Sequence, residues 1–388
     1  MAYPQNIMNM PANGSPSYPF NGQLTDNAIF QTLFNQVISI ETYSDNYSDN
    51  YSKLLNYAKV DASQYGDVKL YIDTDALQSY EWGPTQAQAN KLLDLVSPPD
   101  PAVQAIYLDK FRQVACTVGG LLDRRGFGSE GAFSQFNSTV LGWIADTANI
   151  FRTLYYNSYI GTHEIGTAGT KDENAMNYII NTQGDENPAL TASVALADLI
   201  TDVKHVSRKY NELGFLRNFK EKDLIVVWNS KYYNQLKNAD ELVVFKEVNM
   251  NHGLEYEVLP QDYFGKIVGE SGTITIPADG TDTYRTLIEG DFTGTDGVKV
   301  HLFPSQILPA GATVNKNETY IEDDTIAFKL IAKKSTPMLS SFATSSVFVN
   351  ERVHTQTHFY TFSYNTLISR KGLPFITVRF TEAPNTNG

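Results

Sequence analysis

Three glycines ahead of a long helical pattern have the spacing of a dinucleotide-binding motif. Gly126, Gly128 and Gly131 match G-x-G-x-x-G, in which a tight glycine turn lets the backbone approach a pyrophosphate at a helix N-terminus. That motif also needs an apolar strand just before it and an acidic residue at the end of a second strand. Here a charged stretch precedes the glycines, and Asp146 lies inside the helical pattern. We therefore interpret the three glycines as a flexible hinge and not as a nucleotide site.

The histidines and the single cysteine offer few combinations for a metal site. His354 and His358 are four residues apart, which would suit a metal site on a helix, but their β-branched and aromatic surroundings predict a strand. On a strand the two positions are about 13 Å apart, too far to share an ion. Cys116 is the only cysteine, so an intrachain disulfide and a cysteine-based zinc site are both excluded. We expect Cys116 to be a small buried residue.

Other short patterns fail to complete a catalytic or binding motif. Ser129 lacks the G-x-S-x-G context, and His163 with Glu164 lacks the second histidine of H-E-x-x-H. Residues 166–171 lack P-loop spacing, and the Asp-Asn repeat over residues 44–51 lacks the spacing and terminal glutamate of an EF-hand. Carboxylates are plentiful, but the sequence does not pair them for acid–base work. We therefore predict no catalytic, cofactor-binding or metal-binding residues, and a protein that is not an enzyme.

The composition is that of a soluble globular protein with substantial cores. Hydrophobic residues make up 42% and charged residues 19% of the 388 residues. The formal net charge is -13, which is unsuited to tight, non-specific DNA binding because such binding needs many Lys and Arg contacts to phosphates. Met1–Pro16 lacks the charged and apolar regions of a signal peptide, and no apolar run approaches the roughly 20 residues of a membrane span. We expect an intracellular product that does not contact a membrane.

The elements that must position any functional residue are organised around one long helix, predicted over residues 136–160. Asn137, Ser138 and Thr139 are candidate N-caps and Gly161 is the predicted stop, which gives a length of about 37 Å. A second helix is predicted over residues 191–213, with Gly214 as its stop. The apolar stripe of the long helix is Phe136, Val140, Trp143, Ile144, Ala148, Phe151, Leu154 and Tyr155.

The segments before the long helix predict an arm and an extended loop. Residues 1–23 are rich in Pro, Asn, Gly and Ser, and residues 26–38 have the pattern of a short amphipathic helix. Two strand patterns follow, over residues 67–74 and 102–118, as the two sides of a long hairpin-like loop. An isolated hairpin is marginally stable in water, so we expect its apolar side chains to need a partner surface. These side chains are Leu70, Tyr71, Ile72, Ile106, Tyr107 and Leu108.

The segments after the second helix predict a mixed body of helices and strands. Residues 224–228 form a wholly apolar run that is typical of a strand buried on both faces, and residues 229–236 predict a helix. Residues 269–325 are rich in Gly, Asp and Thr, and we expect a solvent-facing, β-rich excursion there. Three further strands are predicted at the C-terminal end, over residues 325–332, 359–364 and 375–380. The fold class is therefore α+β.

This order of elements resembles the major capsid proteins of tailed bacteriophages, which have the Hong Kong 97-type fold. The chain is most similar to phi-twenty-nine-like and small streptococcal or staphylococcal podovirus capsid subunits. The stretches that carry the resemblance are residues 136–159, 197–214, 222–227 and 350–369, whereas residues 269–325 have no clear counterpart.

The resemblance implies a division of the chain into five parts. They are an N-terminal arm with a short helix (1–64), an extended loop with the glycine hinge (65–130), a peripheral domain with the spine helix (131–221), an axial domain with a β-rich insertion at about 269–325 (222–349), and return strands of the peripheral domain with a C-terminal tail (350–388). We expect the hinge glycines to permit different loop angles in pentamers and hexamers.

The resemblance also implies a function and partners. The subunit would self-assemble as pentamers and hexamers into an icosahedral shell around double-stranded DNA, which it would contact without sequence specificity. Scaffold, portal and head-fibre or decoration proteins would be further partners, no cofactor is implied, and assembly would take place in the host bacterial cytoplasm. Two alternatives remain open on the residues alone: another phage structural protein, such as a tail or portal component, and a glycan hydrolase that uses carboxylates of the β-rich part.

Overall fold

The computed structural model describes residues 53–62, 66–79, 97–119, 130–182, 188–238, 251–278, 282–340, 343–352 and 355–381. The predicted short helix at residues 26–38 and the repeat at residues 44–51 lie outside this part of the chain. The chain divides into two compact units. One unit comprises residues 1–49, 115–146 and 345–360, and the other comprises residues 50–114, 147–344 and 361–388.

The larger unit is built on a five-stranded mixed sheet. The strand order is β5 (Asn177–Ile180), β19 (Phe375–Phe380), β15 (Ile326–Ala332), β6 (Leu224–Asn229) and β7 (Glu255–Leu259). β15 is antiparallel to both of its neighbours, whereas β19 pairs in parallel with β5 and β6 pairs in parallel with β7. All six residues of β6 are buried, which confirms the strand predicted from its continuous apolar run.

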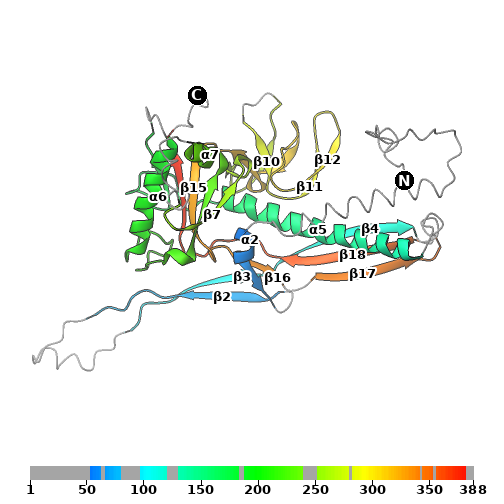
Figure 1. Ribbon diagram of the computed structural model, residues 1–388, viewed down its shortest axis with the longest axis horizontal. Coiled ribbons are helices and arrows are strands. Elements are labelled where there is room, and N and C mark those ends of the chain that lie inside the picture. The colour runs from blue at the N-terminus through cyan, green and yellow to red at the C-terminus, as the bar shows by residue number, and fades with distance from the viewer. Residues whose placement is uncertain are drawn as a thin grey trace, which may run out of the picture. The chain divides into compact units, whose positions relative to one another are not determined.

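Helices cover both faces of this sheet, and this arrangement explains why every residue of β6 and β15 is buried. On one face, α6 (Pro188–Lys204) and α7 (Ser230–Asn238) pack against Val226, Trp228 and Phe328. On the other face, α2 (Lys53–Ala58) and the end of α5 (Glu130–Thr162) pack against Ile225 and Val227. Figure 1 shows α6 and α7 beside the strands. Among the described residues, no helix is long and apolar enough to cross a membrane.

The long helix exists as predicted, but both of its predicted ends are wrong. α5 begins at Glu130, so Asn137, Ser138 and Thr139 lie inside the helix and are not its caps. Gly161 is also helical, since α5 ends at Thr162. The glycine has a packing role: a Cβ at this position would overlap the carbonyl oxygen of Tyr263 in η5 (Gln261–Tyr263). Gly161 therefore permits a close approach to a neighbouring backbone and does not stop the helix.

The second helix is shorter than predicted. α6 ends at Lys204, where the amide of Phe219 donates to the carbonyl of Val203 at 3.1 Å and so satisfies one of the last helical acceptors. The chain then turns back on itself, and Ser207 and Arg217 exchange two backbone hydrogen bonds. Val206, which lies within the predicted helical range, is 63% exposed as a result. The polar residues around it favoured a turn that periodicity alone did not reveal.

Several further strands of the chain pair outside the five-stranded sheet. β1 (Lys59–Asp61) pairs with β16 (Met338–Ser340), and β2 (Val68–Asp73) pairs with β3 (Ala102–Tyr107). A three-stranded sheet has the order β17 (Ala343–Asn350), β18 (Thr355–Tyr364) and β4 (Lys110–Gly119). His358 lies on β18, as its sequence context predicted, and His354 lies outside the described residues. Cys116, on β4, is only half-buried, so the expectation of full burial is wrong.

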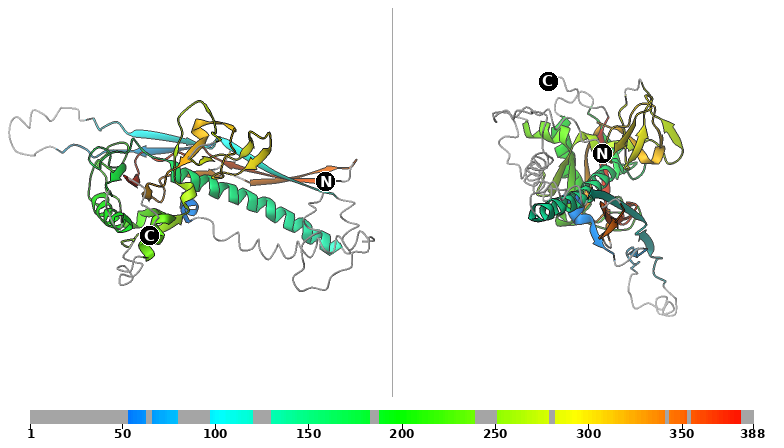
Figure 2. Two further views of the ribbon diagram at one scale, coloured as in Figure 1. Left: turned by 90° about the horizontal axis from the view of Figure 1, so that it is seen from above. Right: turned by 90° about the vertical axis from the view of Figure 1, so that its right-hand side faces the viewer.

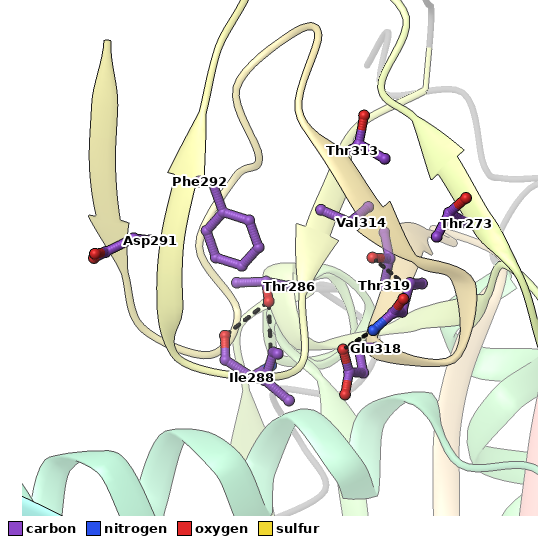
Figure 3. Close-up of a pocket in the computed structure, with 10 residues that line it drawn as sticks. Thr273, Thr286, Ile288, Asp291, Phe292, Thr313, Val314, Glu318 and Thr319 are labelled. Atoms are coloured by element: carbon purple, nitrogen blue, oxygen red, sulfur yellow. Dashed lines mark hydrogen bonds between the residues drawn. The ribbon is translucent and has the colours of Figure 1, made fainter. Parts of the chain in front are cut away.

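Residues 269–325 are β-rich, as predicted, and they contain a small core of their own. The strands here are β9 (Thr273–Thr275), β10 (Tyr284–Thr286), β11 (Gly290–Thr293), β12 (Lys299–Leu302), β13 (Thr313–Asn315) and β14 (Thr319–Glu322), which also pairs with β8 (Gly265–Ile267). They gather in one yellow-to-orange cluster in Figures 1 and 2, and part of the cluster is enlarged in Figure 3. Ile276 is buried in this core, whereas Val300 is exposed.

Replacing Gly161 by alanine should destabilise the protein by about 2 kcal/mol or more, because the new methyl group would overlap the Tyr263 backbone. Gly142→Ala is the matched control: it lies in the same helix with no atom within 4 Å of the position that a Cβ would take, and alanine favours helix there by about 1 kcal/mol. Urea unfolding of both variants measures the difference. Equal free energies of unfolding for the two variants would contradict the packing role of Gly161.

Candidate functional site

The predicted extended loop is present as an antiparallel pair whose two faces differ. β2 and β3 are in register from Val68 opposite Tyr107 to Asp73 opposite Ala102. Directly opposite residues of an antiparallel pair project from the same face, and side chains alternate between faces along each strand. One face therefore carries Val68, Leu70, Ile72, Val103, Ala105 and Tyr107, and we call it the outer face.

The outer face is apolar and largely uncovered. Leu70, Ile72, Val103 and Tyr107 are each between 57% and 63% exposed, and the remaining two residues are half-buried. Single exposed hydrophobic residues are ordinary, but a contiguous apolar sheet face is typical of a surface that binds something. The outer face is therefore the candidate functional site.

The inner face of the pair packs against the same chain. Ile106 and Leu108 are each 1% exposed in a cluster with Ala62 and Leu339. Tyr71 is half-buried, and the guanidinium of Arg370 lies 4.2 Å from the centre of its ring. The six residues predicted to need a partner surface thus divide into two groups. Leu70, Ile72 and Tyr107 are on the outer face, whereas Tyr71, Ile106 and Leu108 are covered by their own chain.

One strand of the pair is anchored at its end by carboxylates. Asp73 is 5% exposed, and its Oδ1 forms an ion pair with the guanidinium of Arg217 at 2.8 Å. It also packs against Gly372, where a side chain would overlap the carboxylate. Two residues on, Asp75 accepts hydrogen bonds from the backbone amide of Leu216 at 2.9 Å and from Arg208 at 2.7 Å. These donors lower the pKa of Asp75 to about 2, so the carboxylate stays ionised.

The other strand is anchored to the segment between β18 and β19. Gln104 Nε2 donates to the carbonyl of Ser369 at 2.9 Å, and its Oε1 accepts from the amide of Lys371 at 3.0 Å. Just after the strand, Asp109 accepts from the backbone amide of Thr366 at 2.8 Å and from its hydroxyl at 2.7 Å. The antiparallel pair is therefore held at both of its ends by directed hydrogen bonds, which fix the orientation of the outer face.

The described residues do not test the hinge predicted at the three glycines. Gly131 is the second residue of α5, and Gly126 and Gly128 lie outside the described residues. The hinge stays a prediction.

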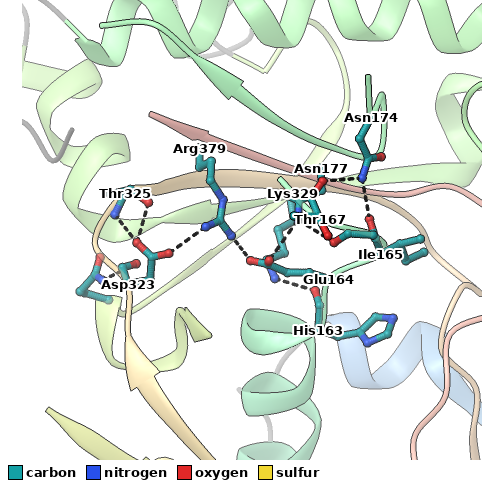
Figure 4. A network of polar contacts seen from close by, with 12 residues as sticks. His163, Glu164, Ile165, Thr167, Asn174, Asn177, Asp323, Thr325, Lys329 and Arg379 are labelled. Carbon is teal, nitrogen blue, oxygen red and sulfur yellow. Dashed lines mark hydrogen bonds and ion pairs between the residues drawn. The ribbon is translucent and has the colours of Figure 1, made fainter. Parts of the chain in front are cut away.

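A buried ionic network, which the sequence did not predict, joins distant parts of the larger unit (Figure 4). Arg379 on β19 binds Glu164, just after α5, and Asp323, just before β15, with the latter contact at 3.0 Å. Asn177 on β5 donates to Glu164 at 3.1 Å. Lys329 on β15 is fully buried, and its Nζ donates to the carbonyl of His163 at 2.9 Å. The network thus fixes the end of α5 against three strands.

Burial changes the charge states within this network. It lowers the pKa of Lys329 to about 7, although the carboxylates of Glu164 and Asp323 partly oppose the shift. Burial also lowers the pKa of His163 to about 4, helped by the nearby charge of Lys329. The imidazole is held between Tyr159, which stacks on it at 4.8 Å, and Ser369, which lies 2.8 Å from Nε2. His163 is therefore a neutral packing residue at physiological pH.

The network has the features of a structural element. Its charged groups bind each other and backbone carbonyls. Within the described part of the chain, no group of three or more His, Cys, Asp or Glu side chains is placed to hold a metal ion. We therefore interpret the network as a structural element.

Comparison with known proteins identifies similar folds. No family model matches the sequence, and no curated protein matches it. The structure is similar to the capsid structure of Staphylococcus phage Andhra, with a TM-score of 0.54 and 11% identity over 84% of each chain. It is also similar to a chain in the structure of the head fiber and inner core protein gp22 of native bacteriophage P68, with a TM-score of 0.52 and 12% identity over 84% of this chain and 83% of that one. These similarities confirm the mixed helix-and-strand fold and relate it to the fold in a phage capsid.

Asp73→Asn should loosen the hairpin anchor, because it leaves Arg217 without its buried carboxylate partner, at a cost of about 2 kcal/mol. Hydrogen exchange should become faster in β2 and β3 and stay unchanged in β6 and β15. Asp61→Asn, at an exposed position on β1, is the control. An exchange pattern in Asp73→Asn identical to that of the control would contradict the anchor.

Lys329 should make stability depend on pH. The unfolded lysine keeps its proton up to about pH 10.5, whereas the folded one releases it near pH 7. The unfolded state therefore binds more protons between these values, so the free energy of unfolding should rise with pH above 7, by up to about 1.4 kcal/mol per unit. Lys329→Met should remove this slope between pH 7.5 and pH 9 in urea unfolding.

Lys266 is exposed, and Lys266→Met is the matched control for Lys329→Met. This control should keep the wild-type slope of unfolding free energy against pH. If the slope survives in Lys329→Met, another group causes it and the assignment to Lys329 is wrong.

Proposed function

We propose that the chain is the major capsid subunit of a tailed bacteriophage. In this proposal, copies assemble as pentamers and hexamers into an icosahedral shell that encloses double-stranded DNA. The observation that carries the proposal is the anchored hairpin with its exposed apolar outer face, and the similarity to the Andhra capsid structure supports it. The subunit would be a component of the virion.

Within this proposal the fold is of the Hong Kong 97 type. β2 and β3 belong to the extended loop (65–130), α5 is the spine helix of the peripheral domain (131–221), and residues 222–349 form the axial domain. Residues 269–325 are an insertion in the axial domain, and residues 350–388 return to the peripheral domain. The N-terminal arm (1–64) contains α2, which packs into the larger core through Leu54, Leu55 and Ala58. Gly126, Gly128 and Gly131 would let the loop adopt different angles in pentamers and hexamers.

A second copy of the chain is the partner that best fits the outer face. Every copy carries the same apolar surface, so contact between copies repeats and can close into rings and shells. Burying several hundred Å² of apolar surface at about 25 cal/mol per Å² contributes several kcal/mol per contact before the cost of association. Because Asp73 and Asp75 hold one end of the strand pair, Asp109 holds the opposite end and Gln104 lies between them, less of this energy is lost to ordering the hairpin.

The charge of the chain fits a container for DNA. A shell wall that bound phosphates tightly would oppose the packaging and release of DNA. With a net charge of -13, the subunit would not bind phosphates tightly. Contact with DNA would therefore be weak and independent of sequence. Scaffold, portal and head-fibre or decoration proteins would be further partners of the shell.

Leu70→Ser combined with Ile72→Ser should abolish shell assembly and leave the subunit folded, because both side chains are exposed on the outer face. Sedimentation and negative-stain microscopy measure assembly, and circular dichroism measures folding. Val298→Ser with Val300→Ser is the matched control, since it removes two exposed aliphatic side chains from the β-rich segment. The control should form particles of normal size.

Replacing residues 67–109 by a short Gly/Ser linker should also prevent assembly. This change is less specific, because it removes Ile106 and Leu108 and so uncovers Ala62 and Leu339. Normal particles from either hairpin variant would contradict the proposed role of the loop. Small rings or fibres from the wild-type chain, in place of shells, would favour a tail or portal component.

A further inference from the structure

The β-rich segment contains a pocket of about 170 Å³ between strands β9, β10, β11, β13 and β14 (Figure 3). This volume is smaller than that of a typical drug-sized site, so it suits one small ring. The lining residues are Thr273, Thr286, Ile288, Asp291, Phe292, Thr313, Val314, Asn315, Glu318 and Thr319. The pocket lies within the larger unit and apart from the outer face of the hairpin.

The lining combines one aromatic ring with many hydroxyl, carboxylate and amide groups. Phe292, Ile288 and Val314 provide the apolar part, and Figure 3 shows the ring of Phe292 between the strands that line the pocket. Threonine, asparagine and acidic side chains supply the polar part. A sugar ring has the matching character, because its C–H groups form an apolar face that packs on an aromatic ring while its hydroxyls project around the edge.

The polar side of the pocket is held in place by internal hydrogen bonds. Thr286 Oγ1 donates to the carbonyl of Ile288 at 2.7 Å, and Thr319 Oγ1 donates to the carbonyl of Asn315 at 2.9 Å. Asn315 Nδ2 donates to Glu318 Oε2 at 2.8 Å. This leaves Glu318 Oε1 as an acceptor for a ligand hydroxyl, in a side chain whose position is already fixed.

The charge of the pocket selects among sugars. Asp291 and Glu318 both line it, and no Lys or Arg is among its described lining residues. His301 and Lys299 contact Asp291 at 2.7 Å and 3.1 Å, and these contacts lower the pKa of its carboxyl group, which stays ionised. Lys299 and His301 offset the charge of Asp291, so the carboxylate of Glu318, which is bonded by the neutral amide of Asn315, is the group that repels an anionic ligand and disfavours sialic and uronic acids relative to uncharged sugars.

We propose that this pocket binds a single uncharged pyranose residue, such as the terminal sugar of a glycan. The ring packs on Phe292, and its hydroxyls bond to Glu318, Asn315 and the threonines of the pocket edge. The proposal does not depend on assembly, since every residue involved belongs to one segment of one chain. With one ring and few hydrogen bonds, the dissociation constant is on the order of 1 mM.

Saturation-transfer NMR on the purified full-length protein tests this directly, with galactose, glucose and N-acetylglucosamine as neutral probes and N-acetylneuraminic acid as the anionic one. At least one neutral sugar should receive magnetisation from the protein, and the anionic sugar should receive at least fivefold less. Absence of transfer to every neutral sugar, or equal transfer to the anionic one, would overturn the proposal.

Two variants link the signal to the pocket. Thr313→Lys places a long side chain at an exposed lining position and should reduce the transfer at least fivefold, whereas Asn317→Lys, at an exposed position nearby that does not line the pocket, should leave it unchanged. Phe292→Ala should also abolish transfer, but it alters the small core, so the Thr313 variant decides the outcome. Undiminished transfer in Thr313→Lys would show that the sugar binds elsewhere and would overturn the proposal.

Discussion

The strand alternation of β2 and β3 gives the hairpin two different faces, and the chain covers only one of them. Ile106 and Leu108 are buried against Ala62 and Leu339, while Leu70, Ile72 and Tyr107 remain exposed. Since a two-stranded hairpin has little stability of its own, the inner contacts and the carboxylate anchors must hold it. The same contacts leave the outer face available. The proposed assembly depends on this division, because a hairpin with both faces covered would have nothing left to bind a neighbour.

The rest of the larger unit provides the rigid support that such a surface needs. The central sheet is covered on both faces by helices, and the ionic network of Glu164, Asp323 and Arg379 ties the end of α5 to β15 and β19. The anchors of β3, Gln104 and Asp109, attach to the segment between β18 and β19, which leads directly into that sheet. Force applied to the outer face by a neighbour would therefore reach the core through directed bonds. The β-rich segment has its own small core and is separate from this path.

Much of the fold could be predicted from the sequence because its signals are local. The apolar run at β6, the alternation in β2 and the long apolar stripe of α5 each lie within one continuous stretch, and the structure confirms all three elements. The alternation also contained the information needed to assign the outer face, since Val103 and Tyr107 lie four residues apart on β3. Which of the two faces is covered, however, depends on Ala62 and Leu339, which are distant in the sequence.

The features that the sequence did not predict all depend on contacts between distant residues. Position 161 lies within the helix and is occupied by glycine because the backbone of Tyr263, about a hundred positions later, leaves no space for a Cβ. Lys329 is a buried lysine, which its apolar strand context did not reveal, and its environment is set by residues from three separate segments. The early end of α6 follows from a bond to Phe219 beyond the turn.

The most direct test of the central claim is a cryo-electron microscopy map of particles assembled from the purified chain. The account predicts that the outer face, with Leu70, Ile72, Val103 and Tyr107, is covered by a neighbouring copy in every subunit of a closed shell. A shell in which this face is exposed to solvent in every copy, with contacts made elsewhere, would contradict the account.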